Sequence, residues 1–296
     1  FIQISTVKDL YDVRLDLTAN YILMNDIDLT EATASGGEWD FDGRGWNPIG
    51  SNDIYSNEAF SGIFDGNGHS IIGMRIAYTS NNKPSGIENS AYAGLFANVT
   101  GEVRNLDMKN VNIEKAYASD KLYVGAIAAY NSGVIKDCSV SGNVKSSDDG
   151  YYVGAISGYN KGTISGCYNT ATVIAHEYAG GISGYNTKTI ENCYNTGAVS
   201  ETYSEYAGGI TGYNSGTSAK VDACYNIGAV SAQSKSNAYA IAFTPSGTTT
   251  NAYYLSGTGV GSTGATALTA AQTKVETMYV GFDFDEVWLL NTNAIY

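Results

Sequence analysis

One short motif occurs four times between Leu122 and Val230. Each copy has a glycine, a small residue and an isoleucine, then a tyrosine three residues after the isoleucine, then asparagine, and later a cysteine. The copies begin at Gly125, Gly154, Gly180 and Gly208, and their cysteines are Cys138, Cys167, Cys193 and Cys224. The cysteines are 29, 26 and 31 residues apart, and a valine follows each of them by six residues. A period of this size is typical of arrays whose units bury their apolar faces only by stacking on one another.

The apolar residues inside each copy alternate with polar ones and are interrupted by Gly and Asn, without a helical period. Three short strands per copy fit one turn of a parallel β-helix, and the crossover rule makes this coil right-handed. The motif glycine also recurs at Gly62 and Gly94, and Ile241 to Ala252 keeps the motif's spacing with alanine in place of cysteine. We therefore predict an all-β chain folded as a right-handed parallel β-helix.

Short capping helices are predicted at both ends of this solenoid. Residues 5–17 have apolar side chains at helical spacing, and residues 21–29 are predicted as the first strand. Residues 269–272 form a capping-box pattern that opens a helix to Tyr279, and residues 282–290 are predicted as a terminal strand. We expect one continuous domain, with an N-terminal cap and first strands at 1–58, β-helix repeats at 59–255 and a C-terminal cap at 256–296.

The charge balance limits the possible partners. With 29 acidic against 16 basic residues, the formal charge of −13 repels phosphate backbones, so nucleic acid is not expected as a partner. No run of about 18 apolar residues is present, so no membrane insertion is expected. Phe1 opens without the basic region and apolar core of a signal peptide, and we expect the chain to belong to a longer protein with flanking domains.

The four cysteines are predicted to form an unbridged ladder inside the solenoid. Equivalent positions in successive turns lie about 4.8 Å apart, as neighbouring strands do. Bridged cysteines prefer β-carbons about 3.8 Å apart, so small buried thiols are favoured over disulfides. A metal site on this column would need a second type of ligand, which the repeat does not supply, and no cofactor is predicted.

Residues 94–97, 154–160, 180–186 and 192–199 resemble the GLUG-motif repeats of bacterial surface and secreted proteins. Residues 21–69 resemble the usual start of such regions, and residues 281–288 resemble their usual end. The resemblance implies an extracellular location in a bacterium, within a multi-domain adhesin or carbohydrate-associated protein, and it implies no single activity.

Related repeats accompany metallopeptidases of the IgA-protease type, whose zinc helix needs His-Glu-x-x-His. This chain has only His69 and His176, and the residues that follow His176 lack the second histidine of that motif. We therefore expect the peptidase activity to be absent from this chain.

Recurrent tyrosines are the candidate binding residues. Stacked aromatic residues on a β-helix usually pack on one another, but a column that faces solvent can also contact sugar rings and hydrogen-bond sugar hydroxyls. Alternation from the motif isoleucine turns the following tyrosine outward. The candidate ligand-binding column is therefore Tyr130, Tyr159, Tyr185 and Tyr213. The repeated asparagines are interpreted as turn ladders whose amides bond along the axis.

Acidic residues gather where the copies differ in length. A solvated acidic rim is the simplest interpretation, and Asp148 with Asp149 is a weak candidate for calcium. A glycoside hydrolase would use paired carboxylates, for which Glu177 and Glu205 on neighbouring turns are the candidates. A lyase acting on acidic sugars would need basic groups, and no arginine follows Arg104.

We expect a non-catalytic extracellular module at the bacterial cell surface that serves in adhesion or glycan binding, with glycans or host and cell-surface molecules as its partners. A polysaccharide-degrading enzyme that uses the acidic edge, and a structural spacer between other domains, are the alternatives.

Overall fold

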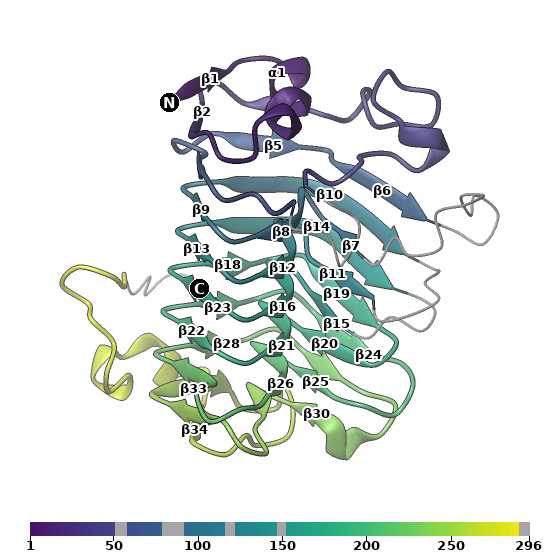
Figure 1. The fold of residues 1–296 in the computed structure, drawn as a ribbon. Coiled ribbons are helices and arrows are strands. Elements are labelled where there is room, and N and C mark those ends of the chain that lie inside the picture. Colours follow the sequence, from purple (N-terminus) through teal and green to yellow (C-terminus); the bar gives the residue numbers. More distant parts are fainter. Residues whose placement is uncertain (51–57, 79–91, 116–121, 147–151, 290–296) are drawn as a thin grey trace.

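The computed structural model describes residues 1–50, 58–78, 92–115, 122–146 and 152–289. Within these ranges the chain is all-β and forms a parallel solenoid, seen in Figure 1 as stacked turns that run from the purple N-terminal end to the yellow C-terminal end. We call one turn of this solenoid a rung. The predicted parallel β-helix is confirmed, because strands of neighbouring rungs pair in parallel in four sheets.

The two largest sheets form two sides of each rung. The nine-stranded sheet contains, in order, β1 (Ile2–Ile4), β2 (Tyr21–Leu23), β4 (Ile63–Asp65), β9 (Glu102–Arg104), β13 (Val134–Lys136), β17 (Thr163–Ser165), β22 (Thr189–Glu191), β27 (Lys220–Asp222) and β32 (Thr248–Thr250). The thirteen-stranded sheet contains β3 (Ile27–Asp28), β5 (Ser70–Ile72), β6 (Arg75–Tyr78), β10 (Asp107–Lys115), β14 (Ser139–Ser146), β18 (Tyr168–Asn169), β19 (Thr172–Ala175), β23 (Tyr194–Asn195), β24 (Val199–Glu201), β28 (Tyr225–Asn226), β29 (Val230–Ser231), β33 (Ala252–Leu255) and β34 (Ala265–Leu268).

Two six-stranded sheets complete the rungs. One contains β7 (Tyr92–Ala93), β11 (Tyr123–Val124), β15 (Tyr152–Gly154), β20 (Tyr178–Gly180), β25 (Ala207–Gly208) and β30 (Ala238–Tyr239). The other contains β8 (Phe96–Val99), β12 (Ala128–Asn131), β16 (Ser157–Asn160), β21 (Ser183–Asn186), β26 (Thr211–Asn214) and β31 (Ala242–Phe243). In each full motif copy the strands of these two sheets are consecutive in the chain, so a single bend joins them.

The repeated apolar residues point inward and form one continuous core. The motif isoleucines are completely buried at 127, 156, 182, 210 and 241, and the core runs from Ile4 to Tyr254. Tyr225 pairs with Tyr253, so Ala252 occupies the cysteine position in the last rung, as predicted. Each buried isoleucine contributes about 1.5–3 kcal/mol on burial, and this contribution recurs from rung to rung.

Two ladders of buried asparagines tie the rungs together. In the first, the side-chain amide of Asn131 donates to Asn160 at 2.8 Å, Asn160 donates to Asn186 at 2.8 Å, and Asn186 donates to Asn214 at 2.9 Å. A second ladder links Asn169, Asn195 and Asn226 at 2.8 Å. In both ladders the side-chain oxygen also accepts from the backbone two residues later, as Asn160 does from Gly162. The prediction of turn ladders that bond along the axis is confirmed.

The four cysteines are free and completely enclosed within the solenoid. Each follows the nine-stranded sheet and directly precedes a strand of the thirteen-stranded sheet. The thiol of Cys193 donates to the carbonyl of Glu191 at 3.1 Å, and the other three cysteines make the equivalent contact. Burial raises the pKa of the Cys138 and Cys193 thiols well above its usual value. In these two cysteines the thiolate, which is the reactive form, is therefore suppressed.

We expect the folded protein to leave all four thiols unreacted with a thiol-selective reagent at neutral pH. After denaturation without reductant, four equivalents should react, because the four cysteines are unbridged. The measurement is the number of thiols titrated before and after unfolding. A count below four after unfolding would contradict the free ladder, and rapid reaction in the folded state would contradict its burial.

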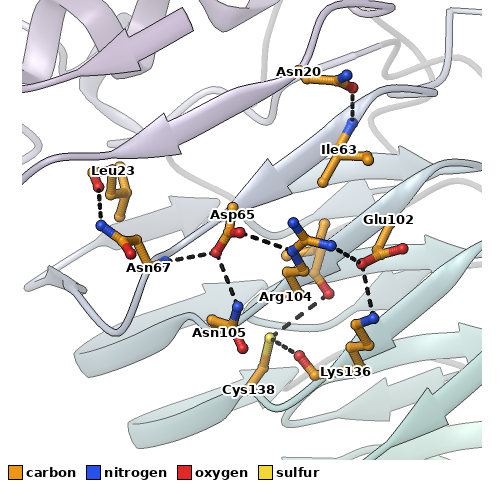
Figure 2. Close-up of polar contacts among 11 residues, drawn as sticks. Asn20, Leu23, Ile63, Asp65, Asn67, Glu102, Arg104, Asn105, Lys136 and Cys138 are labelled. Carbon is orange, nitrogen blue, oxygen red and sulfur yellow. Dashed lines mark hydrogen bonds and ion pairs between the residues drawn. The ribbon is translucent and has the colours of Figure 1, made fainter. Parts of the chain in front are cut away.

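Charged side chains join the first rungs on the outer face of the nine-stranded sheet (Figure 2). Asp65 accepts from Arg104 Nε at 2.8 Å and from Asn105 Nδ2 at 3.0 Å. Arg104 also donates to Glu102 at 3.0 Å, and Lys136 Nζ lies 3.2 Å from the same carboxylate. Partial burial raises the pKa of Asp65, but the hydrogen bonds from Asn105 and Arg104 outweigh it and hold this pKa below its ordinary value. These contacts connect β4, β9 and β13.

The N-terminal helix is confirmed, although it is shorter than predicted. α1 covers Val7–Asp12 and is followed by the 3₁₀ turn η1 (Val13–Leu15), and Thr6 with Asp9 forms a capping box. The strand predicted at 21–29 is instead two strands, β2 and β3, and the unpredicted strand β1 pairs with β2 at the edge of its sheet. Among the described residues, no helix is long and apolar enough to span a membrane.

The predicted C-terminal helix is wrong. The side chain of Gln272 accepts from the backbone and hydroxyl of Thr269 at 2.9 Å, as the capping pattern predicts. The residues that follow form only the 3₁₀ turns η5 (Gln272–Lys274) and η6 (Glu276–Met278). The ring of Tyr279 is buried against Tyr225 and Tyr253, at 5.6 and 5.2 Å between ring centroids. This packing of Tyr279 prevents the residues before it from forming a regular α-helix.

The predicted strand at 282–290 is also wrong over its described part, 282–289. Asp283 accepts hydrogen bonds from the backbone of Asp285 and Glu286, both at 3.0 Å, and so closes a turn in place of a strand. The rings of Phe282 and Trp288 then stack at 4.4 Å across this turn.

Candidate functional site

Each rung bends sharply between the two six-stranded sheets. At the bend between β15 and β16, a Cβ on Gly154 would lie 2.3 Å from the carbonyl oxygen of Ser157. A Cβ on Gly158 would lie 2.6 Å from the backbone nitrogen of Val124 in the preceding rung. The motif glycines are therefore needed for close backbone approach. The bend brings Tyr152 and Tyr159 together on its outside, at 5.5 Å between centroids and 72° between ring planes.

The tyrosines before and after the bend form two columns that run along the solenoid. The first tyrosine column is Tyr92, Tyr123, Tyr152, Tyr178, Tyr206 and Tyr239, and the second tyrosine column is Tyr130, Tyr159, Tyr185 and Tyr213. We call the two columns together the tyrosine strip. All residues of the predicted candidate column thus lie together on one surface, and each of its rings is partly exposed.

The second tyrosine column is nearly regular. Tyr130 and Tyr159 stack at 5.1 Å with 3° between their planes, and Tyr159 and Tyr185 stack at 5.1 Å with 4°. Tyr185 and Tyr213 continue the stack at 5.0 Å and 18°. The regularity follows from the strand register, which pairs each tyrosine with the one in the next rung.

The first tyrosine column packs edge to face against the second. Tyr123 lies 5.7 Å from Tyr130 at 80°, and Tyr178 lies 5.5 Å from Tyr213 at 86°. Such T-shaped pairs contribute about 0.5–1.5 kcal/mol each beyond area burial. Two residues that the motif did not reveal lie at the end of the strip. Tyr239 continues the first column, and Phe243 is the strand partner of Tyr213 but stacks its ring on Tyr206 at 4.0 Å. A one-residue shift in register hides Phe243 from the motif spacing.

The phenol groups of Tyr123 and Tyr178 in the strip are held in their neutral form. Burial, with a smaller effect of neighbouring tyrosines, raises the pKa of Tyr123 to about 12. Burial and then the Glu205 carboxylate raise the pKa of Tyr178 further. A neutral phenol both donates and accepts hydrogen bonds, so the strip presents groups that match sugar hydroxyls.

The arrangement determines which parts of the rings a ligand can reach. Neighbours in the same column cover the faces of Tyr159 and Tyr185, and the first column packs on their edges. Ring edges and phenol groups are the parts of these partly exposed rings that the stacking leaves uncovered. Hydrogen bonding along the strip is therefore the stronger contribution that these residues can make, and stacking of a sugar on a ring face is the weaker one.

A third set of tyrosines lies on the thirteen-stranded sheet. Tyr168 and Tyr194 stack at 4.9 Å with 2° between planes, but Tyr225 and Tyr253 are covered by the C-terminal segment. Trp288 of that segment reaches Tyr194, with 6.1 Å between ring centroids. The chain itself therefore occupies much of this surface, which leaves the tyrosine strip as the more open aromatic surface.

The acidic candidates have different environments. Glu201 is buried, and its carboxylate accepts from the backbone of Ser204 at 2.7 Å and of Gln233 at 3.3 Å, which gives it a structural role. Glu177 and Glu205 directly precede paired tyrosine positions of the strip, so they border it on neighbouring rungs. Asp148 and Asp149 lie outside the described residues. In the described ranges, no group of three or more His, Cys, Asp or Glu side chains could hold a metal ion.

The two histidines lie on different rungs. His69 Nδ1 is 3.5 Å from Asp26 near the N-terminal end, whereas His176 stacks on Tyr203 at 4.4 Å in the middle of the solenoid.

Residues 175–200 match the model of the GLUG motif. A solved structure from Bacteroides ovatus, described as a "putative immunoglobulin A1 protease", is similar with a TM-score of 0.62 and 20% sequence identity, over 95% of this chain and 87% of that chain. At this identity the likeness shows the fold alone. The comparison with curated proteins gave no match. This chain is a parallel β-helix that carries a GLUG motif on the rung of Tyr178 and Tyr185.

Proposed function

We propose that this chain is a non-catalytic, extracellular module of a bacterial surface or secreted protein, and that it binds glycans through the tyrosine strip. The single observation that carries the proposal is the strip itself: two interlocked tyrosine columns, partly exposed, that continue over successive rungs. Tyrosine combines apolar area with a hydrogen-bonding tip and suits surfaces that bind polar ligands. GLUG repeats occur in surface and secreted proteins, which supports the location.

Tyr159→Phe combined with Tyr185→Phe tests this function. The double variant removes two phenol hydroxyls and keeps the ring stack, so the fold should persist. If each hydroxyl makes one hydrogen bond to a sugar, worth about 0.5–1.5 kcal/mol, the affinity for a glycan found on an array should fall about tenfold. The measurement is the dissociation constant for that glycan, with thermal unfolding as a check on the fold.

The matched control is Tyr168→Phe with Tyr194→Phe, because this pair is equally well stacked on another sheet. Its affinity should stay within twofold of the unchanged protein. Equal affinity in both double variants would place binding elsewhere. Failure to bind any glycan would favour the spacer, and release of new reducing ends or unsaturated products would favour an enzyme that uses Glu177 and Glu205.

A further inference from the structure

The spacing of the second tyrosine column limits the shape of a polymer that can lie along it. Successive ring centroids are 5.1, 5.1 and 5.0 Å apart, close to the distance of about 4.8 Å between neighbouring strands. A ligand aligned with the solenoid axis therefore meets a chemically equivalent phenol on each rung. Only a polymer whose rise per unit has nearly the same length keeps one unit opposite each phenol.

A β-1,4-linked chain of glucose-like sugars has this property. Both linkage bonds of each sugar are equatorial, so the chain extends as a ribbon whose rise per sugar is close to the rung spacing. Successive sugars are turned over by about half a turn, so successive phenols meet hydroxyls from alternating edges of the ribbon. An α-1,4-linked chain coils, and its hydroxyls leave the line of the phenols after a few sugars. The spacing also stays constant from Tyr130 to Tyr213, because the strands that carry these residues pair without a shift in register.

The charges that border the strip favour a polymer without acidic groups. The carboxylates of Glu177 and Glu205 act on the strip: both contribute to the raised pKa of Tyr178, after the larger effect of burial. Glu205 also acts on Tyr206 and Tyr213, again after burial. Uronate or sulfate groups laid along the strip would approach these carboxylates, and the whole chain carries a formal charge of −13.

We propose that the tyrosine strip binds an uncharged, extended β-1,4-linked polysaccharide that lies parallel to the solenoid axis, with about one sugar per rung. This inference rests on the proposed function and adds the class of ligand, its direction and its length. The matched segment runs from Tyr130 to Tyr213, and it holds four consecutive sugars in register.

A length series of oligosaccharides tests the proposal on the intact chain. The probes are β-1,4-linked glucose oligomers of two to six sugars, α-1,4-linked glucose oligomers of the same lengths, and polygalacturonate. Affinity for the β-1,4 series should rise roughly two- to tenfold with each sugar up to four and then level off. The α-1,4 series should stay flat with length, and polygalacturonate should not compete.

Tyr213→Phe provides an internal ruler, because it removes the hydroxyl at one end of the column and retains the ring. The levelling-off point should move from four sugars to three, whereas Tyr168→Phe on the other sheet should leave it at four. A flat β-1,4 series, or a steeper α-1,4 series, would overturn the proposed ligand class. If the β-1,4 series fails but the Tyr159→Phe/Tyr185→Phe variant loses affinity for another glycan, the proposed function stands and this inference is wrong. If the unchanged protein binds no glycan at all, both are wrong.

Discussion

Gly184→Ala is expected to lower the free energy of unfolding by about 3 kcal/mol or more. Gly184 lies in β21, just after the bend between β20 and β21, and faces the backbone of the preceding rung. An added Cβ would lie 2.5 Å from the backbone nitrogen of Val153 and 2.8 Å from the carbonyl carbon of Tyr152. These atoms belong to the backbone of the preceding rung and cannot rotate away as a side chain can. Urea-induced unfolding measures the loss.

Gly261→Ala is the matched control for this substitution. Its backbone is not in the left-handed region, and the nearest atom to an added Cβ is the Tyr254 hydroxyl at 3.4 Å. Its stability should change by less than about 1 kcal/mol. Ala129 and Ala97 occupy the Gly184 column two and three rungs earlier, respectively. If the two glycine variants were equally stable, the backbone at Gly184 would accommodate a Cβ as the earlier rungs do. The close contacts would then not explain why glycine is needed there.

Asn186→Leu is expected to cost about 3–5 kcal/mol, because Asn186 lies in the interior of a buried ladder. Its side chain accepts from Asn160 at 2.8 Å and donates to Asn214 at 2.9 Å and to the carbonyl of Lys188 at 3.0 Å. Leucine has a similar branched shape but is larger, so the loss reports polar groups left without partners together with crowding, and not a cavity. Chemical denaturation followed by circular dichroism measures it.

Asn131→Leu is the graded control within the same ladder. Asn131 donates to Asn160 at 2.8 Å, and within the described residues it is the first asparagine of the ladder. Its substitution breaks one link of the ladder, whereas that of Asn186 breaks two. Its cost should be about half that of Asn186→Leu. If both variants lost less than about 1 kcal/mol, water or a relaxed backbone would be satisfying the ladder partners, and the ladder would not be a main source of stability.

The sequence predicted the parts of the fold that depend on neighbouring rungs. Ile156, Cys167 and Asn160 recur at matching places because every rung meets the same neighbours, so the repeat itself encodes inward columns and ladders. The C-terminal region has no such repetition. Thr269 and Gln272 form their local cap, but the burial of Tyr279 outweighs the helical preference that the cap creates.

The candidate site was predictable in part. Alternation along the strand correctly placed Tyr159 and Tyr185 on the outside. It could not predict that each ring covers its neighbours' faces, because this depends on side-chain tilt and on the edge-to-face contact with Tyr152. Nor could it predict that Trp288 and Tyr279 pack against the third set of tyrosines. That contact joins the repeats to a C-terminal segment that does not follow the repeat pattern.

The asparagine ladders also bear on how such a protein can change its length during evolution. The Asn160–Asn186 and Asn186–Asn214 links have almost the same geometry, at 2.8 and 2.9 Å, although the intervening segments differ in length. A gene duplication that inserts one more rung would therefore give the inserted asparagine a hydrogen-bond donor in the preceding rung and an acceptor in the following rung. Such an insertion would lengthen the tyrosine strip by one tyrosine from each column without a new type of contact. The length of the strip along the axis can therefore evolve separately from the side-chain chemistry of each rung.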